Sequence, residues 1–142
     1  WRLSIMASTL KINTLTGVTT AGSIAVTGEG NSTTTNLQQG LCKSWINFDG
    51  SGTVSTNDSF NISTLTDNAV GENTTTYTNS FGSANYTGTG LPKRETSTNY
   101  PNMANIDGTV TTSAMKIIYT EYDNSGRTDC DLITQTFHGD LA

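Results

Sequence analysis

The sequence is poor in the residues from which metal sites and disulfide frameworks are built. Its 142 residues include two cysteines, one histidine and two prolines. Two cysteines do not make a disulfide framework, and with a single histidine they do not supply a zinc site. We expect free thiols, with one disulfide between Cys42 and Cys130 as the alternative. We expect neither a metal nor a cofactor.

Charge is also scarce. Charged residues make up 13% of the chain, and seven Lys and Arg stand against twelve Asp and Glu, giving a net charge of −5. Lys93 and Arg94 form the only adjacent basic pair. Because no basic patch is available to displace counterions from phosphates, nucleic acid and anionic membrane surfaces are not expected partners. No apolar run approaches the ~20 residues of a membrane-spanning helix.

Threonine, serine, asparagine and glycine fill the composition instead. There are 28 threonines and 14 glycines, while hydrophobic residues make up 33%. Threonine is β-branched and favours strands, whereas glycine, asparagine and serine favour turns. Short strand patterns joined by turns, without long helical stretches, predict an all-β fold. We expect an antiparallel β-sandwich of jelly-roll or immunoglobulin-like type.

The distribution of apolar residues divides the chain at residue 40. Residues 1–40 form an N-terminal β-rich stem or attachment segment, with short strands expected near 10–15 and 24–26. Two such strands cannot bury a core alone, so we expect the stem to pair with other chains. Residues 41–142 form the β-sandwich.

Three local predictions accompany this division. The spacing of Leu37, Leu41 and Trp45 allows a short helix that begins near residues 34–36. Residues 110–122 and 128–138 are predicted to pair as a hairpin. Residues 90–108 hold both prolines and are predicted to be the longest loop and a functional surface.

The aromatic and aliphatic residues of the expected strands define the core. The predicted core residues are Trp45, Phe48, Phe60, Ile62, Tyr77, Phe81 and Ile117. Trp45 has a second interpretation as a sugar-stacking platform, but the largest aromatic of a small domain is more often buried. The candidate binding residues are Tyr100 and Asn99 in the long loop, together with Tyr86, which could contact a glycan.

Catalytic chemistry has little support. Asp129 and Asp131 lie two apart on a predicted strand and would share a face, as paired carboxylates of a glycosidase could. No other acidic residues cluster with them, and no G-x-S-x-G motif accompanies His138. The segments 49–52 and 123–126 fit hairpin turns better than calcium loops. We expect no catalytic residue and no enzymatic activity.

Two motifs resemble a known module. KSWINFDGSGTV at 43–54 and DSFNISTLTDN at 58–68 resemble a module of virion proteins from marine tailed bacteriophages, and the ending FHGDLA is similar. Cys42 departs from the pattern, where alanine would be expected. The resemblance carries only structural residues: Trp45, Asn47, Phe48, Gly50, Gly52, Phe60, Asn61, Asp67 and Asn68.

This resemblance implies a non-enzymatic virion structural protein, namely a short fibre, a knob, or a capsid or tail decoration on the virion surface. We expect a homotrimer whose residues 7–40 bind other virion proteins. The alternative is a receptor-binding tip that recognises host surface polysaccharide. A bacterial adhesin or pilin-like subunit is a third hypothesis.

Overall fold

The structure is a computed structural model of the whole chain. It describes residues 10–18, 24–28, 33–93, 102–121 and 126–140. The chain divides into two compact units, Trp1–Leu37 and Gln38–Ala142. We expected a boundary after residue 40, and the division between the units falls after Leu37.

The described residues of the first unit contain one small hairpin. Strand β1 (Ala25–Thr27) pairs antiparallel with β2 (Thr34–Asn36). The strand predicted near residues 10–15 is absent, because residues 10–18 pair with no other strand. Alternating apolar residues do not make a strand without a hydrogen-bonded neighbour.

A single short helix, α1 (Leu37–Gly40), follows β2. The prediction of a helix running on to Trp45 is wrong, because the chain is already extended in β3 (Ser44–Asp49). Gly40 is a poor helix former, and the helix ends there.

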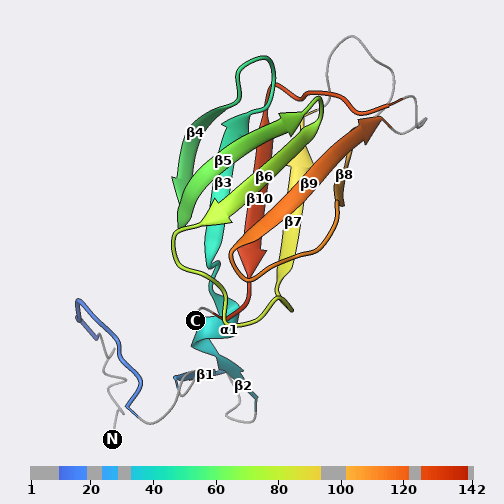
Figure 1. Cartoon of the computed structure of the whole chain (residues 1–142). Coiled ribbons are helices and arrows are strands. Elements are labelled where there is room, and N and C mark those ends of the chain that lie inside the picture. The colour runs from blue at the N-terminus through green and yellow to red at the C-terminus, as the bar shows by residue number, and fades with distance from the viewer. Residues whose placement is uncertain (1–9, 19–23, 29–32, 94–101, 122–125, 141–142) are drawn as a thin grey trace, which may run out of the picture. The chain divides into compact units, whose positions relative to one another are not determined.

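Gln38–Ala142 contains two four-stranded antiparallel sheets that pack as a sandwich (Figure 1). The first sheet has the order β4 (Ser55–Phe60), β3, β10 (Ile133–His138), β7 (Thr87–Pro92). The second has the order β5 (Ile62–Ala69), β6 (Glu72–Tyr77), β9 (Ala114–Glu121), β8 (Asn102–Ile106). The prediction of an all-β sandwich is confirmed.

Two predictions about connections are wrong. Strands β9 and β10 do not pair as a hairpin, because β9 lies between β6 and β8 whereas β10 lies between β3 and β7 in the other sheet. The segment 90–108 is not one loop, because Asn102–Ile106 forms β8 and pairs with β9. Alternation identifies a strand but not its partner.

Asn61 makes the crossover from the first sheet to the second, between β4 and β5. Its φ of 59° lies in the left-handed region, which asparagine tolerates better than most residues. Its Nδ2 donates to the carbonyl oxygens of Lys43 and Asn79, at 3.1 Å each. Its Oδ1 accepts from the Asn79 backbone N–H at 2.8 Å. One side chain therefore joins three segments at this corner.

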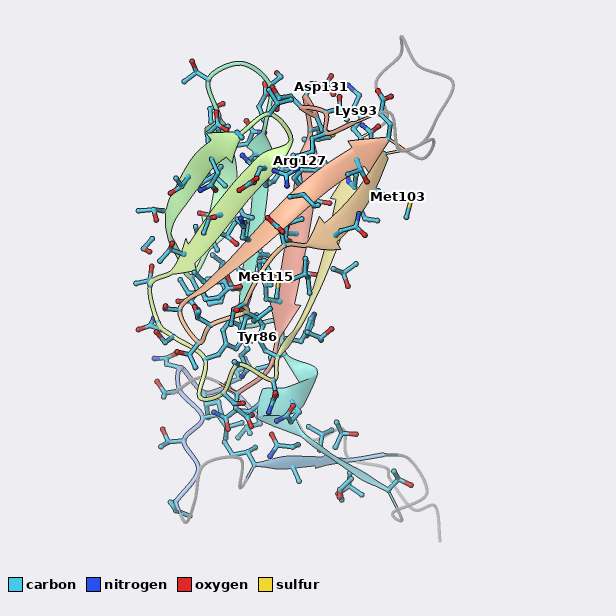
Figure 2. The ribbon with its side chains drawn as sticks, turned by 45° about the vertical axis from the view of Figure 1, so that its right-hand side comes forward. Tyr86, Lys93, Met103, Met115, Arg127 and Asp131 are labelled. Atoms are coloured by element: carbon cyan, nitrogen blue, oxygen red, sulfur yellow. The ribbon has the colours of Figure 1, made fainter. Side chains whose placement is uncertain are left out.

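The core lies between the two sheets. Its buried residues are Ile46, Phe48, Tyr77, Phe81, Met115, Ile117, Tyr119, Cys130, Ile133 and Phe137. Tyr77 packs edge-on against Phe81 and Phe137, with ring centroids 4.9 and 5.3 Å apart. Figure 2 shows Met115 inside the sandwich and Met103 projecting away from β8. Four predicted core residues, Phe48, Tyr77, Phe81 and Ile117, are buried, and Ile62 packs against them partly buried.

Candidate functional site

Of the three predicted binding residues, the structure describes Tyr86. Asn99 and Tyr100 lie outside the described residues. Tyr86 stacks on Phe81 with ring centroids 4.1 Å apart. Its hydroxyl accepts from the Tyr77 hydroxyl and donates to the Ala114 carbonyl oxygen, both at 3.2 Å. Burial raises the pKa of Tyr86 above its usual value, so this ring supports the core.

The two aspartates considered for catalysis serve different contacts. Neither lies on a strand, because β10 begins at Ile133. Asp129 Oδ1 accepts from the Gly71 backbone N–H at 2.7 Å. Asp131 Oδ2 pairs with Lys93 Nζ at 2.8 Å, with both side chains about half exposed (Figure 2). The prediction that the two carboxylates share one strand face is wrong.

Asp49 holds a turn. Its Oδ1 accepts from the Ser51 backbone N–H at 2.8 Å and from the Ser51 hydroxyl at 2.6 Å. These hydrogen bonds lower the pKa of the Asp49 carboxyl. The second turn considered for calcium includes residues 123–125, which lie outside the described part of the chain.

Cys42 and Cys130 do not form a disulfide, and they lie at opposite ends of the first sheet. Cys42 Sγ donates to the carbonyl oxygen of Ser44 at 3.1 Å, at the start of β3. Cys130 lies near the other end of β3, where its carbonyl oxygen accepts from the Gly50 N–H at 2.9 Å. The six residue steps from Ser44 to Gly50 span about 20 Å of extended chain, well beyond the reach of a disulfide.

No group of three or more His, Cys, Asp or Glu side chains suitable for a metal ion occurs among the residues that the structure describes. Within the same residues, no helix has the length and apolar character to cross a membrane.

Trp45 and Phe60 lie on the outer face of the first sheet, which corrects our prediction that both are in the core. Burial alternates along β3, with Ile46 and Phe48 facing the core and Trp45 facing outward, half-buried. Phe60 pairs directly with Trp45 across β3 and β4 and is 52% exposed. Directly opposed residues of antiparallel strands share a face, so the two aromatics are neighbours.

The Trp45–Phe60 pair begins a row that crosses all four strands. The row contains Phe60, Trp45, Thr136 and Thr89. The next outward row contains Asp58, Asn47, Thr134 and Leu91. We call these eight residues the aromatic face. Asp58 is the one charged residue among the eight, at the β4 edge.

The sequence did contain a signal for this orientation. Ile46 and Phe48 occupy one phase of the β3 alternation, while Asn47 and Asp49 occupy the other. Trp45 belongs to the polar phase. The size of tryptophan favoured burial, but the period of the strand decided its face.

The outer face of the second sheet carries charge instead. Lys116 Nζ lies 3.0 Å from Glu72 Oε1 and 2.7 Å from Asp107 Oδ2, and Arg127 also pairs with Glu72. The hydrogen bond from Lys116 holds the pKa of Glu72 and that of Asp107 below their usual values. The same two carboxylates, Asp107 first, raise the pKa of Lys116. Each charge is neutralised by a partner, which is typical of a structural cluster.

Comparisons of the chain with protein-family models, with curated proteins and with solved structures found no match.

Proposed function

We propose that this chain is a non-enzymatic structural protein displayed on a bacteriophage particle, as a short fibre, a knob, or a capsid or tail decoration. The proposal is supported by the resemblance of residues 43–54 and 58–68 to a module of virion proteins. One structural observation also supports it: the described part of the N-terminal unit exposes five large apolar residues.

Five large apolar side chains among the described residues of the N-terminal unit face solvent. They are Leu10 at 77% exposed, Ile12 at 49%, Leu15 at 53%, Val18 at 96% and Val26 at 53%. None of the described residues from 10 to 37 is buried. The sandwich, by contrast, has a continuous buried core.

A unit of this size needs a stabilising element beyond its own hydrophobic core. Domains below about 40 residues usually depend on disulfides, metals or association with other chains. The sequence of the N-terminal unit has no cysteine or histidine, and Glu29 is its only acidic residue. Its own residues therefore supply neither a disulfide nor a set of metal ligands. We therefore propose that residues 7–40 assemble with copies of the same chain, as a homotrimer, and with capsid or tail proteins.

The carboxylates considered for catalysis or for calcium binding make structural contacts, which supports a non-enzymatic function. Asp129 binds a backbone amide, and Asp131 is paired with Lys93. Asp49 holds its own turn. The sandwich is then a module for display rather than for chemistry.

Mass spectrometry of purified particles tests the proposal. Particles from a lysate that encodes this chain should contain it in fixed stoichiometry with a capsid or tail protein. Antibodies raised against the chain should label the particle surface in electron micrographs. Absence of the chain from purified particles contradicts the proposal.

The second candidate function, recognition of host polysaccharide, is favoured by a separate observation. Trp45 and Phe60 form an outward-facing aromatic pair. If the chain binds a glycan, this face is a better candidate than Tyr86, which is packed in the core cluster.

A further inference from the structure

We infer that the aromatic face of the first sheet is a binding site for a neutral polysaccharide, with Trp45 and Phe60 as its stacking platform. This inference deepens the second candidate function and does not involve the N-terminal unit. Its failure would therefore leave the proposed assembly function standing.

The geometry supplies an extended surface. Four strands at their usual spacing make a row about 14 Å long, which suits a short oligosaccharide segment rather than a single ring. The platform lies at one end, where Phe60 is paired with Trp45. Exposed threonines, Thr136 and Thr89, continue the same row.

The chemistry of the face matches a sugar chain. The C–H face of a pyranose is apolar and packs on an aromatic ring, while the hydroxyl groups at its edge need hydrogen-bond partners. Threonine hydroxyls donate and accept hydrogen bonds, as the Asn47 carboxamide does. Asn57 Nδ2 donates to Asn47 Oδ1 at 2.8 Å, which orients that carboxamide beside Trp45.

Charge selects a neutral ligand. The face carries no cation among its eight residues, and its one charged group is the Asp58 carboxylate. The chain has a net charge of −5. A polyuronate, a sulfated polysaccharide or a nucleic acid would be repelled rather than attracted.

The apolar area is too small for a stable protein interface. A fully covered aromatic side chain buries about 150–250 Å². Because Trp45 is already half-buried and Phe60 is 52% exposed, the two rings together leave about 250 Å² or less for a partner to cover. A standard protein interface buries about 800 Å² on each partner and has an apolar core. Here threonine hydroxyls and the Asn47 carboxamide lie beside the two rings, and Leu91, 68% exposed, lies at the β7 end of the second row. This arrangement suits a polar ligand with an apolar face.

Affinity electrophoresis of the full-length chain tests the inference. The gels contain dextran, galactomannan or a soluble β-glucan as neutral probes, and alginate as the anionic comparison. The variants are Trp45→Ala, Phe60→Ala and the conservative Trp45→Phe. Met103→Ala is the matched control, because Met103 is 46% exposed on β8 of the other sheet. Thermal melting of each variant establishes that it is folded.

At least one neutral polysaccharide should retard the parent chain, and alginate should not. Trp45→Ala and Phe60→Ala should each weaken binding about tenfold or more, as expected when an aromatic stacking platform is removed. Trp45→Phe and Met103→Ala should bind within about twofold of the parent. In NMR spectra of the parent chain, the polysaccharide that binds should shift the backbone amide signals of Thr89, Thr134 and Thr136. This measurement requires no variant.

The inference is overturned if no neutral probe retards the chain, or if alginate binds as tightly as the neutral probes. It is equally overturned if the folded Trp45→Ala and Phe60→Ala variants keep full affinity, or if amide shifts appear only outside the aromatic face. If a variant unfolds, the NMR titration of the parent chain decides whether the aromatic face binds the polysaccharide.

Discussion

Asp129 accepts a 2.7 Å hydrogen bond from the backbone N–H of Gly71, 58 positions earlier in the chain. Gly71 lies in the turn between β5 and β6, and its carbonyl oxygen accepts from the Tyr119 N–H at 2.8 Å. The segment that leads into β10 is thereby attached to the second sheet. This contact holds together the end of the sandwich where the chain passes from one sheet to the other.

Gly71→Ala should strongly destabilise the sandwich. Gly71 has a φ of +61°, and an added Cβ would lie 2.7 Å from the backbone N and O of Thr128. Left-handed strain costs about 1–2 kcal/mol, and overpacking adds about 1–3 kcal/mol. Urea unfolding measures the sum.

Gly52→Ala is the matched control for Gly71→Ala. Gly52 has nearly the same φ of +58°, but nothing lies within 4 Å of its added Cβ. It should show only the left-handed strain of about 1–2 kcal/mol. Equal losses in the two variants would show that the close approach to Thr128 does not matter.

Asn61→Ala should cost about 2–4 kcal/mol, because it combines left-handed strain with the loss of hydrogen bonds worth about 0.5–1.5 kcal/mol each. Asn61→Gly should cost less, since glycine adopts positive φ freely. Asn57→Ala is the control, because Asn57 is exposed and its side chain makes one hydrogen bond, to Asn47. A loss for Asn61→Ala no larger than that of Asn57→Ala would remove Asn61 from its role at the sheet crossover.

Acid should weaken the sandwich through the cluster of Glu72, Asp107 and Lys116. The folded pKa values of both carboxyls are lowered, so their stabilisation is complete above their unfolded values of 4.5 and 3.8 and is lost as the pH falls through the folded values. The Lys116 contribution is present below its unfolded pKa of 10.5 and is lost only at higher pH, through its raised folded value. The urea midpoint of unfolding should therefore decrease as the pH is lowered through the acid range.

Glu72→Gln should flatten this acid dependence. Asp131→Asn should leave the midpoint almost unchanged at neutral pH, because the Lys93–Asp131 pair is about half exposed and such pairs contribute little. If the urea midpoint of Glu72→Gln depends on pH in the acid range as that of the parent does, the cluster is not the cause of the acid dependence.

Trp45→Ala and Phe48→Ala should differ sharply in stability although both residues lie on β3. Phe48 is fully buried, and its truncation should cost about 3–5 kcal/mol. Trp45 is half-buried on the outer face, and its truncation should cost about 1–2 kcal/mol. Calorimetry of both variants measures the difference. A loss in Trp45→Ala that matched the loss in Phe48→Ala would place Trp45 in the core.

The sequence predicted the class of fold because alternation and turn residues are local. The β3–β4 turn, where Asp49 holds Ser51, follows from D-G-S-G, and the burial of Phe48 follows from its strand. Strand pairing did not follow, because β10 lies between β3 and β7, partners that are distant in sequence. Local patterns carry no information on which sheet receives such a strand.

The candidate site was harder to predict because it depends on orientation. Trp45 was assigned to the core on its size, although Asn47 and Asp49 share its phase. Phe60 was assigned to the core as an aromatic on a strand, and only its pairing with Trp45 shows that it faces outward. Tyr86 was considered a surface residue, but its contacts with Phe81 and Tyr77 come from the tertiary fold.

Sedimentation velocity of the full chain and of residues 38–142 tests the assembly function most directly. The full chain should sediment as a trimer, because association between copies would bury Leu10, Leu15 and Val18, which are exposed in the single chain. Residues 38–142, which contain the whole core, should sediment as a folded monomer. A full chain that stays monomeric at high concentration, or a truncated chain that stays trimeric, would contradict the account.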